Sequence, residues 1–288
     1  MKIKNISDEA FTVAGHPFQP QEVKEVEDKT AENLMRIQPV RIKEFSEPIK
    51  VKDVKKKVSV ICITINRKEK TKKTLEKILN NAGMEFELLI ADNGSSDGVK
   101  EYARSKADVF IDNGENKGVG HTLNQLIDKA SGDYICHIGN DIEMEQDWLK
   151  SMAYYQERIE GVCAIHAVQE LHKLEEVNGL KVHLGISVFG PKMFRKGRKY
   201  QEFSRYGFED SVLCLEAYHE GLHNYYIPGY SGKHVGEDTK EKTEYREMKN
   251  RELEKAQPKY LKFIKKYEEN SKARYFSGKI FTAPTIKS

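Results

Sequence analysis

The sequence lacks any apolar run long enough to cross a membrane. Its longest such stretch, residues 58–65, is far shorter than the roughly 20 residues that a spanning helix needs. The first residues, 1–5, also lack the apolar core of a secretion signal. We therefore expect no transmembrane segment and a cytoplasmic location.

The sequence also lacks an excess of one charge. Its 48 basic and 45 acidic side chains are interspersed and give a formal net charge of +3, so no uniform field attracts nucleic acid or membrane. Charged residues are 32% and apolar residues 38% of the 288, which is polar for a globular protein but above the signature of disorder. This length allows one sizeable domain with extensions.

Cysteine is scarce, and no two cysteines have the C-x-x-C spacing of zinc or redox sites. The four that are present lie mostly in apolar stretches and are predicted to be buried free thiols. They are Cys62, Cys136, Cys163 and Cys214.

Turn residues and apolar runs divide the chain into three predicted parts. Residues 1–50 alternate short β-like pieces with turns, include one short helix at 30–37, and are predicted to form a small β-rich module. Residues 57–236 are predicted to form the main domain. Residues 237–288 are predicted to form a charged helical extension, broken at Pro258. Its modest apolar face comprises Tyr260, Leu261, Ile264 and Tyr267.

Strands alternate with helices in the main domain. The β-branched run at 58–65 is typical of a strand buried on both faces, and three more strands are predicted at 86–91, 109–111 and 134–138. Helices are predicted between them, at 69–82, 97–105 and 122–130, and later a helix opens at 207–210. This alternation predicts an α/β fold with a Rossmann-like, mostly parallel sheet flanked by helices.

Polar residues follow each of the first four strands. They are Asn66 and Arg67, the segments 92–98 and 113–120, and the pair Asn140 and Asp141. Ligands of such sheets bind beyond the carboxyl ends of the strands. We therefore expect these four clusters to converge on one edge.

The order of these motifs resembles glycosyltransferase family 2, a group of nucleotide-sugar enzymes with the GT-A fold. The segments 58–67, 88–98 and 116–134 resemble its opening strand, its second-strand signature and the stretch before its metal motif. One such match alone would be unspecific, but all occur in order at normal spacing. The resemblance implies a metal-dependent, inverting transfer of a sugar from a nucleotide diphosphate donor, with a UDP-sugar favoured.

The resemblance also implies which residues contact the donor. Asp92 would accept a hydrogen bond from the nucleotide base, while Thr64, Asn66 and Arg67 would line the nucleoside pocket. The alternative for Asp92 is a turn-forming role in an Asp-Asn-Gly loop. The full predicted donor set is Thr64, Asn66, Arg67, Asp92, Asn93, Ser95, Asn116, Gly118, Asn124 and Asn140.

A diphosphate leaving group concentrates negative charge, which calls for a divalent cation held by carboxylate. Asp141, at a strand end, is the predicted ligand of Mn²⁺ or Mg²⁺. By similarity His234 would complete the shell, although a lone histidine is equally well structural. Gly139 departs from the family's acidic motif. Either Asp141 acts with water and phosphate, or Glu143 helps, or metal dependence is weakened.

The acidic pair Glu209 and Asp210 resembles the family's pair near the acceptor site. An attacking hydroxyl must lose its proton, so Asp210 is predicted to be the general base, with Glu209 contacting acceptor or donor hydroxyls. The alternative is that both acids only cap a helix, where the dipole favours negative charge.

The acceptor is open: a glycan, a protein or hydroxymethylated DNA. Residues 5–26 resemble small β modules of tailed-phage proteins, which would place a phage-encoded enzyme in the host cytoplasm, and the basic segment 192–200 leaves DNA as one option. A catalytically weak binding or adaptor protein of a virion or surface assembly is the main rival function. A nucleotidyltransferase is disfavoured, because no glycine-rich phosphate loop follows the first strand.

Overall fold

The computed structural model describes most of the main part of the chain and short pieces of its N-terminal part. The described residues are 2–5, 11–13, 16–19, 23–25, 27, 30, 42–44, 54–157, 161–164, 175–176, 186–189, 199–219, 222–227, 232–235 and 242–270. Most of the predicted helix at 30–37 and of the basic segment 192–200 lies outside these residues. The chain divides into two compact units, Met1–Lys50 and Val51–Ser288.

The first unit is built from β-strands. β1 (Lys2–Asn5) is the central strand of an antiparallel sheet, between β4 (Val23–Glu25) and β5 (Ile42–Glu44). β2 (Phe11–Val13) and β3 (His16–Phe18) pair with each other in a second antiparallel sheet. The N-terminal module is therefore β-rich, as the turn pattern predicts.

An eight-stranded sheet organises the second unit, in the order β12-β14-β11-β13-β9-β6-β7-β8. β9, β6, β7 and β8 run parallel to one another, and β11 runs parallel to β14, while β13 is antiparallel to both of its neighbours. The strands are β6 (Val58–Thr64), β7 (Glu87–Asp92), β8 (Val109–Asp112), β9 (Tyr134–Ile138), β11 (Gly161–Ala164), β12 (Glu175–Glu176), β13 (Ile186–Phe189) and β14 (His223–Tyr226). This confirms the predicted mostly parallel sheet.

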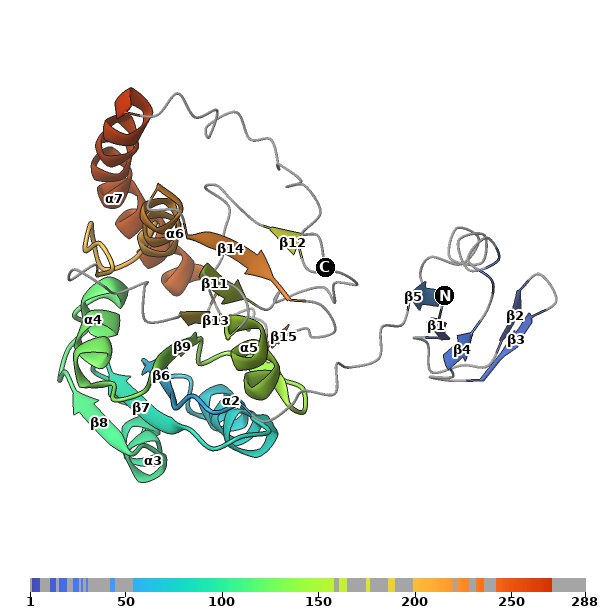
Figure 1. Ribbon diagram of the computed structural model, residues 1–288. Helices are drawn as coiled ribbons and strands as arrows, with labels where there is room; N and C mark the ends of the chain where they lie inside the picture. Colours follow the sequence, from blue (N-terminus) through green and yellow to red (C-terminus); the bar gives the residue numbers. More distant parts are fainter. Residues whose placement is uncertain are drawn as a thin grey trace. The chain divides into compact units, whose positions relative to one another are not determined.

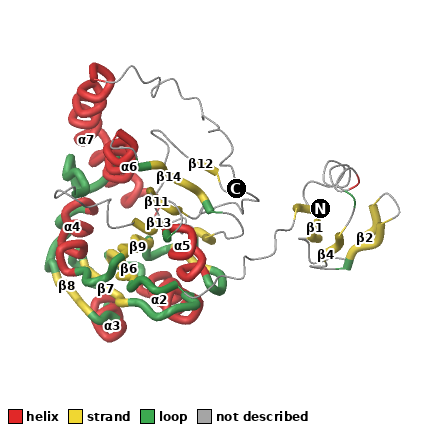
Figure 2. Tube along the Cα trace, viewed as in Figure 1, coloured by secondary structure: helices red, strands yellow, loops and turns green. Residues whose placement is uncertain are grey.

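Helices cover both faces of the sheet (Figures 1 and 2). On one face, Val60 and Cys62 of β6 belong to a core that includes residues of α2 (Lys68–Asn81), α3 (Val99–Lys106) and α5 (Trp148–Gln156). On the other, Ile61 packs in a core with residues of α4 (Val119–Lys129) and α6 (Glu209–His219). Neighbouring residues of one strand thus enter opposite cores, which explains why the run at 58–65 is almost continuously apolar.

A small two-stranded sheet is separate from the main sheet. β10 (Ile142–Met144), just after Asp141, pairs antiparallel with β15 (Gly232–His234). Sequence periodicity predicted neither the β10–β15 pair nor the antiparallel β13, because both arise from pairing between segments distant in the chain.

The predicted break at Pro258 is wrong. α7 (Lys242–Asn270) continues through this proline, whose side chain is exposed. Proline removes one helix hydrogen bond, but the carbonyl freed by an exposed proline can be hydrated by solvent. On the predicted apolar face, Tyr260 and Ile264 are buried with Val212 of α6, whereas Leu261 is 56% exposed. The Tyr267 side chain lies outside the described residues.

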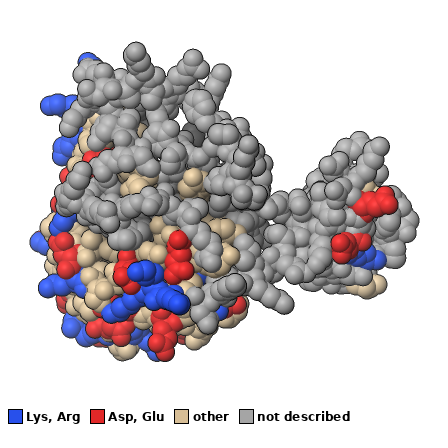
Figure 3. Space-filling model, viewed as in Figure 1, with Lys and Arg blue, Asp and Glu red and all other residues tan. Residues whose placement is uncertain are grey.

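Cys62, Cys136 and Cys214 are buried free thiols, and the side chain of Cys163 is outside the described part. Within the described residues, no helix combines the length and apolarity that a membrane crossing requires. Basic and acidic side chains intermingle on the face of the second unit seen in Figure 3, in keeping with the nearly balanced charge.

Candidate functional site

The loops that follow β6 and β7 lie side by side at the carboxyl edge of the sheet. Thr64 Oγ1 donates a hydrogen bond to Asp92 Oδ2 at 2.9 Å, because these residues are paired at the ends of the two strands. Further out, Asn66 N donates to Ser95 Oγ at 2.8 Å, and Ser96 N donates to Asn66 Oδ1 at 2.9 Å. The structure thus brings together the first two predicted clusters.

The Asp92 carboxylate organises the second loop. It is fully buried and accepts hydrogen bonds from Thr64 Oγ1, from Gly94 N at 3.1 Å, and from Ser95 N and Oγ at 2.8 and 2.5 Å. Four donors occupy most of the acceptor positions of a carboxylate. This is the turn-forming role that the sequence left as the alternative, and contact with a nucleotide base stays a prediction.

The third loop is fastened to the second. Asn93 Oδ1 accepts hydrogen bonds from Asn113 Nδ2 and Thr122 Oγ1, both at 2.8 Å. Asn93 and Thr122 are buried. Asn93 is therefore a buried residue that holds the second and third loops together, and it does not face solvent.

Asn116 and Gly118 form the turn before α4. Gly118 N donates to Asn116 Oδ1 at 2.9 Å, and Val119 N donates to Arg205 O at 2.9 Å. Gly118 has a φ of +93°, and a Cβ there would lie 2.8 Å from Arg205 Cα, so only glycine fits without a backbone shift. This turn thus joins the third loop to the segment that carries the acidic pair.

Asn124 makes a similar connection further along α4. Its Nδ2 donates to Tyr200 O at 3.0 Å, and Tyr200 N donates to its Oδ1 at 2.9 Å. Nδ2 also donates to Glu202 Oε1 at 3.1 Å. The side chain is buried, so Asn124 anchors the 199–202 segment, and direct donor contact by it stays a prediction.

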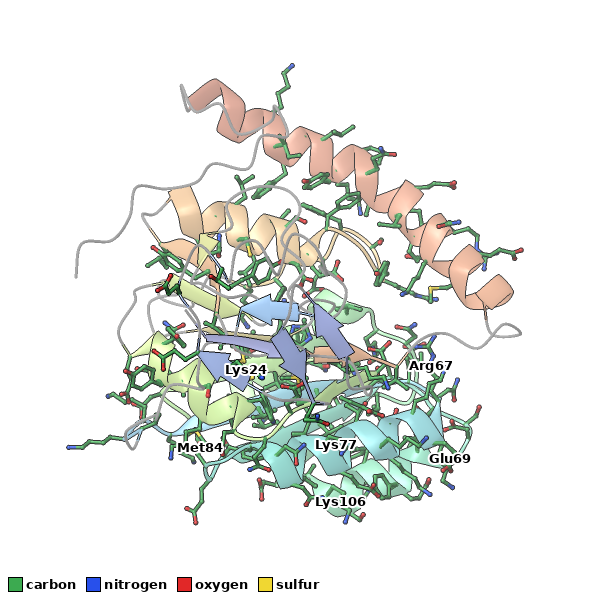
Figure 4. The ribbon with its side chains drawn as sticks, turned by 90° about the vertical axis from the view of Figure 1, so that its right-hand side faces the viewer. Lys24, Arg67, Glu69, Lys77, Met84 and Lys106 are labelled. Atoms are coloured by element: carbon green, nitrogen blue, oxygen red, sulfur yellow. The ribbon has the colours of Figure 1, made fainter. Side chains whose placement is uncertain are left out.

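Arg67 and Asp141 form an ion pair at the centre of this edge. Arg67 Nη1 lies 3.3 Å from Asp141 Oδ2, and the two side chains are only 11% and 20% exposed. Asn66 and Arg67 both have positive φ, at 52° and 62°, which turns the chain sharply between β6 and α2. Figure 4 labels Arg67 beside Glu69, at the start of α2. Asn140 Nδ2 donates to Thr71 Oγ1 at 3.1 Å on the same side.

The other predicted metal ligand lies on the adjacent strand. His234 is paired with Ile142, and Val235 N donates to Asp141 O at 2.8 Å, so the backbones of Asp141 and His234 are neighbours. The His234 side chain is outside the described residues. Glu143 is half-buried, and its backbone lies opposite that of Lys233 in the β10–β15 sheet.

Among the side chains that the structure describes, Asp141 would need further ligands to hold a divalent cation at this edge. In the part of the chain described here, no three His, Cys, Asp or Glu side chains form a group that could hold a metal ion. Asp141 offers one carboxylate, and its partner in this structure is the guanidinium of Arg67. One carboxylate together with substrate phosphates and water is a common Mg²⁺ environment.

The acidic pair begins α6. Gly207 and Phe208 have positive φ, at 120° and 66°, and Gly207 N donates to Glu209 Oε2 at 2.6 Å. Glu209 is buried, while Asp210 is half-buried. Burial, together with the neighbouring charge of Asp210, raises the pKa of Glu209 from 4.5 to about 7. Glu209 thus does bond near the helix start, as the capping alternative expects.

Tyr200 lies between the acidic pair and β9. Burial raises its pKa, and the charge of Asp210 adds to this shift. Its ring meets that of His137 at 6.2 Å in an edge-to-face contact. Burial lowers the pKa of His137 to about 4, so this imidazole is neutral at pH 7. Neither ring was singled out from the sequence, since no spacing marks either one.

The raised pKa of Glu209 predicts a pH-dependent effect of Glu209→Gln on stability. A carboxyl that binds its proton more tightly when folded costs stability as pH rises from the unfolded value of 4.5 to about 7. Glutamine removes the charge and keeps an acceptor for Gly207 N. We expect urea unfolding to show a gain of up to about 3 kcal/mol at pH 8 and little gain at pH 4. An equal gain in the free energy of unfolding at both pH values would contradict the raised pKa of Glu209.

Comparison with known proteins places this geometry in a family context. The family model described as glycosyl transferase family 2 matches residues 59–211, more than half of the 288 residues. The chain is 32% identical over 107 residues to the putative glycosyltransferase EpsE of Bacillus subtilis, covering 35% of this chain and 38% of that protein. It is 25% identical over 141 residues to GalNAc(5)-diNAcBac-PP-undecaprenol beta-1,3-glucosyltransferase of Campylobacter jejuni, covering 46% of each. It thus spans less than half the length of these relatives.

Solved structures share the fold. A mannosyltransferase from Pyrobaculum calidifontis, in complex with GDP-Man and Mn²⁺, aligns with a TM-score of 0.56 at 15% identity, covering 73% of this chain and 64% of that one. S. aureus TarS 1-349, in complex with UDP-GlcNAc, aligns with a TM-score of 0.51 at 17% identity, covering 63% and 60%. The α/β fold is therefore of the GT-A type.

Proposed function

The chain belongs to glycosyl transferase family 2, and from this membership we propose that it moves a sugar from a nucleotide diphosphate donor to a hydroxyl acceptor. One observation supports the proposal above the others. The strand-end loops of β6 and β7 meet at the edge where Arg67 pairs with Asp141, in the motif order of the family. A cationic and an anionic group thus lie together where a parallel sheet receives its ligand.

We assign the donor to this edge, with two kinds of supporting residue. Asn66, Arg67, Ser95, Asn116 and Asn140 retain some exposure and are proposed to contact the nucleotide sugar. The buried members of the set are proposed to shape the pocket through the hydrogen bonds described above. They are Thr64, Asp92, Asn93, Gly118 and Asn124. A UDP-sugar is favoured by family analogy; the two solved structures above hold GDP-Man and UDP-GlcNAc, so the shared fold is compatible with either nucleotide.

A divalent cation, Mn²⁺ or Mg²⁺, would offset the charge of the departing diphosphate when bound. Asp141 is proposed to hold it, with His234 as the second protein ligand because its strand lies against Asp141. Arg67 keeps a fixed positive charge at the same carboxylate. Since Gly139 supplies no side chain there, Arg67 would carry part of the charge stabilisation in this chain.

Asp210 is proposed to take the proton of the attacking acceptor hydroxyl. Glu209, largely protonated below pH 7 because of its burial, is proposed to contact donor or acceptor hydroxyls. A single displacement of this kind inverts the anomeric configuration, as the family resemblance implies. The acceptor, whether glycan, protein or hydroxymethylated DNA, stays open.

A panel of nucleotide sugars tests the proposal. With Mn²⁺ or Mg²⁺ present, we expect one donor to raise the melting temperature and to be hydrolysed slowly in the absence of acceptor. The same donor with EDTA serves as the metal control. Binding without turnover for every donor would instead favour the rival, a glycosyltransferase-like binding or adaptor protein, which the glycine at position 139 makes worth testing.

A further inference from the structure

The segment that leads into the acidic pair has a backbone that needs external support. Phe208 has a φ of +66°, which is unfavourable for a bulky side chain unless its surroundings hold it. Its carbonyl accepts a hydrogen bond from Val212 N at 3.0 Å and so begins α6. The orientation of Glu209 and Asp210, the next two residues, therefore depends on what keeps Phe208 in place.

Helix α7 supplies that support from the side chain of Tyr260. The rings of Phe208 and Tyr260 are stacked, with centroids 4.1 Å apart and planes at 11°. Tyr260 is buried in a cluster with Val212 and Ile264, against which Phe203 also packs. Figures 1 and 4 both show α7 lying against α6. Moving Phe208 to an ordinary backbone conformation would break this stack.

A second contact of α7 fixes Gly207. A Cβ at this position would lie only 2.6 Å from Leu253 Cδ2, so the backbone of Gly207 is pressed directly against α7. Its N–H is the donor to Glu209 Oε2. Leu253 therefore limits where the Glu209 carboxylate can be held.

Glu252 extends the support toward the donor side. Its Oε2 accepts a hydrogen bond from Arg205 N at 2.9 Å, and its carbonyl accepts one from Ser204 Oγ at 2.9 Å. Arg205 O in turn accepts from Val119 N, at the start of α4. One buried side chain of α7 thus holds the segment that touches both the donor-side turn and the acidic pair.

We infer that Glu252, Leu253 and Tyr260 of α7 are positioning residues for the acidic pair, so that α7 belongs to the catalytic unit rather than being a peripheral tail. This inference rests on the proposed role of Glu209 and Asp210. These three residues touch no reacting group; they act by holding residues 204–208. Loss of the Leu253 or Tyr260 side chain, which contact only Gly207 and Phe208 in this segment, should therefore lower the rate constant of turnover and leave nucleotide binding unchanged.

The test compares Tyr260→Ala with two matched variants in the full chain. Tyr260→Phe keeps the stacked ring, and Leu261→Ala alters the adjacent, 56% exposed residue of the same helix. For Tyr260→Ala we expect kcat for donor hydrolysis to fall about 10- to 100-fold with an unchanged Kd for the nucleotide, because small displacements of catalytic groups are costly. If the substitution lets water reach Glu209, the pKa of this carboxyl should fall. The change in kcat that accompanies ionisation of Glu209 should then occur at lower pH than in wild type. Both matched variants should behave like wild type.

Hydrogen exchange separates failure of this inference from failure of the proposed function. In Tyr260→Ala, the amides of residues 205–212 should exchange faster than in wild type and in Leu261→Ala. Unchanged exchange would overturn the inference even if no donor were ever turned over. Faster exchange with unchanged kcat and pH profile, in a protein that does turn over donor, would also overturn it. Full activity of Asp210→Asn would instead count against the base assignment alone.

Discussion

Asp210→Asn is expected to lower donor turnover by about 10²- to 10⁴-fold, the usual contribution of a general base. Asparagine keeps the size of the side chain at the start of α6 but cannot take the acceptor proton. Donor binding should persist, because the donor edge is built from the loops after β6 and β7. Steady-state hydrolysis of the donor found in the panel, together with calorimetric binding, measures both quantities.

The matched control is Asp128→Asn on α4. Asp128 is an exposed acid whose carboxylate pairs with Lys199 at 2.6 Å, outside the proposed site. It should retain wild-type turnover. Wild-type activity in Asp210→Asn would show that another group accepts the proton, and Glu209 would then be tested in the same way above pH 7, where it is ionised.

Asp141→Ala is expected to abolish metal-dependent turnover, with a loss on the order of 10²- to 10³-fold. The variant removes the only carboxylate proposed to hold the cation and deprives Arg67 of this partner. Mn²⁺ binding in the presence of the nucleoside diphosphate, followed by electron paramagnetic resonance, gives a measurement that does not depend on turnover.

Asp112→Asn is the control for this change. Asp112 is also an aspartate at a strand end, and it pairs with Lys100 at 3.1 Å and with Arg104 at 3.5 Å. We expect its Mn²⁺ binding and turnover to match wild type. Undiminished Mn²⁺ binding by Asp141→Ala would place the cation elsewhere. Undiminished turnover by the wild-type protein in EDTA would contradict metal dependence and leave Arg67 to stabilise the charge of the leaving diphosphate.

Most of the sheet could be predicted from the sequence because its strands have a strong local pattern. The run at 58–65 needed no knowledge of its partners, since a β-branched segment apolar on both sides fits only a strand between two cores. β13 was missed because its place between β9 and β11 depends on pairing with distant segments. Pro258 misled for a related reason: whether a proline ends a helix depends on whether the freed carbonyl is exposed.

In the candidate site too, local sequence predicted some features, and others depend on segments distant in the chain. The order of motifs was sufficient to locate Asp141 and the Glu209–Asp210 pair at element ends, and their chemical roles stay predictions. The sequence left two roles open for Asp92, and the structure shows the turn-forming hydrogen bonds around it. The Arg67–Asp141 pair joins residues far apart in the chain, and no spacing rule could reveal it.

The sequence by itself determined the family, the alternation of strands and helices, and which polar residues follow which strand. Those features follow from local periodicity and motif order, which are properties of short segments. Only the tertiary structure decided that Arg67 faces Asp141, that Tyr200 lies between β9 and the acidic pair, and that α7 supports Phe208. Contacts of this kind depend on how distant segments pack, and packing depends on the shape of the whole core.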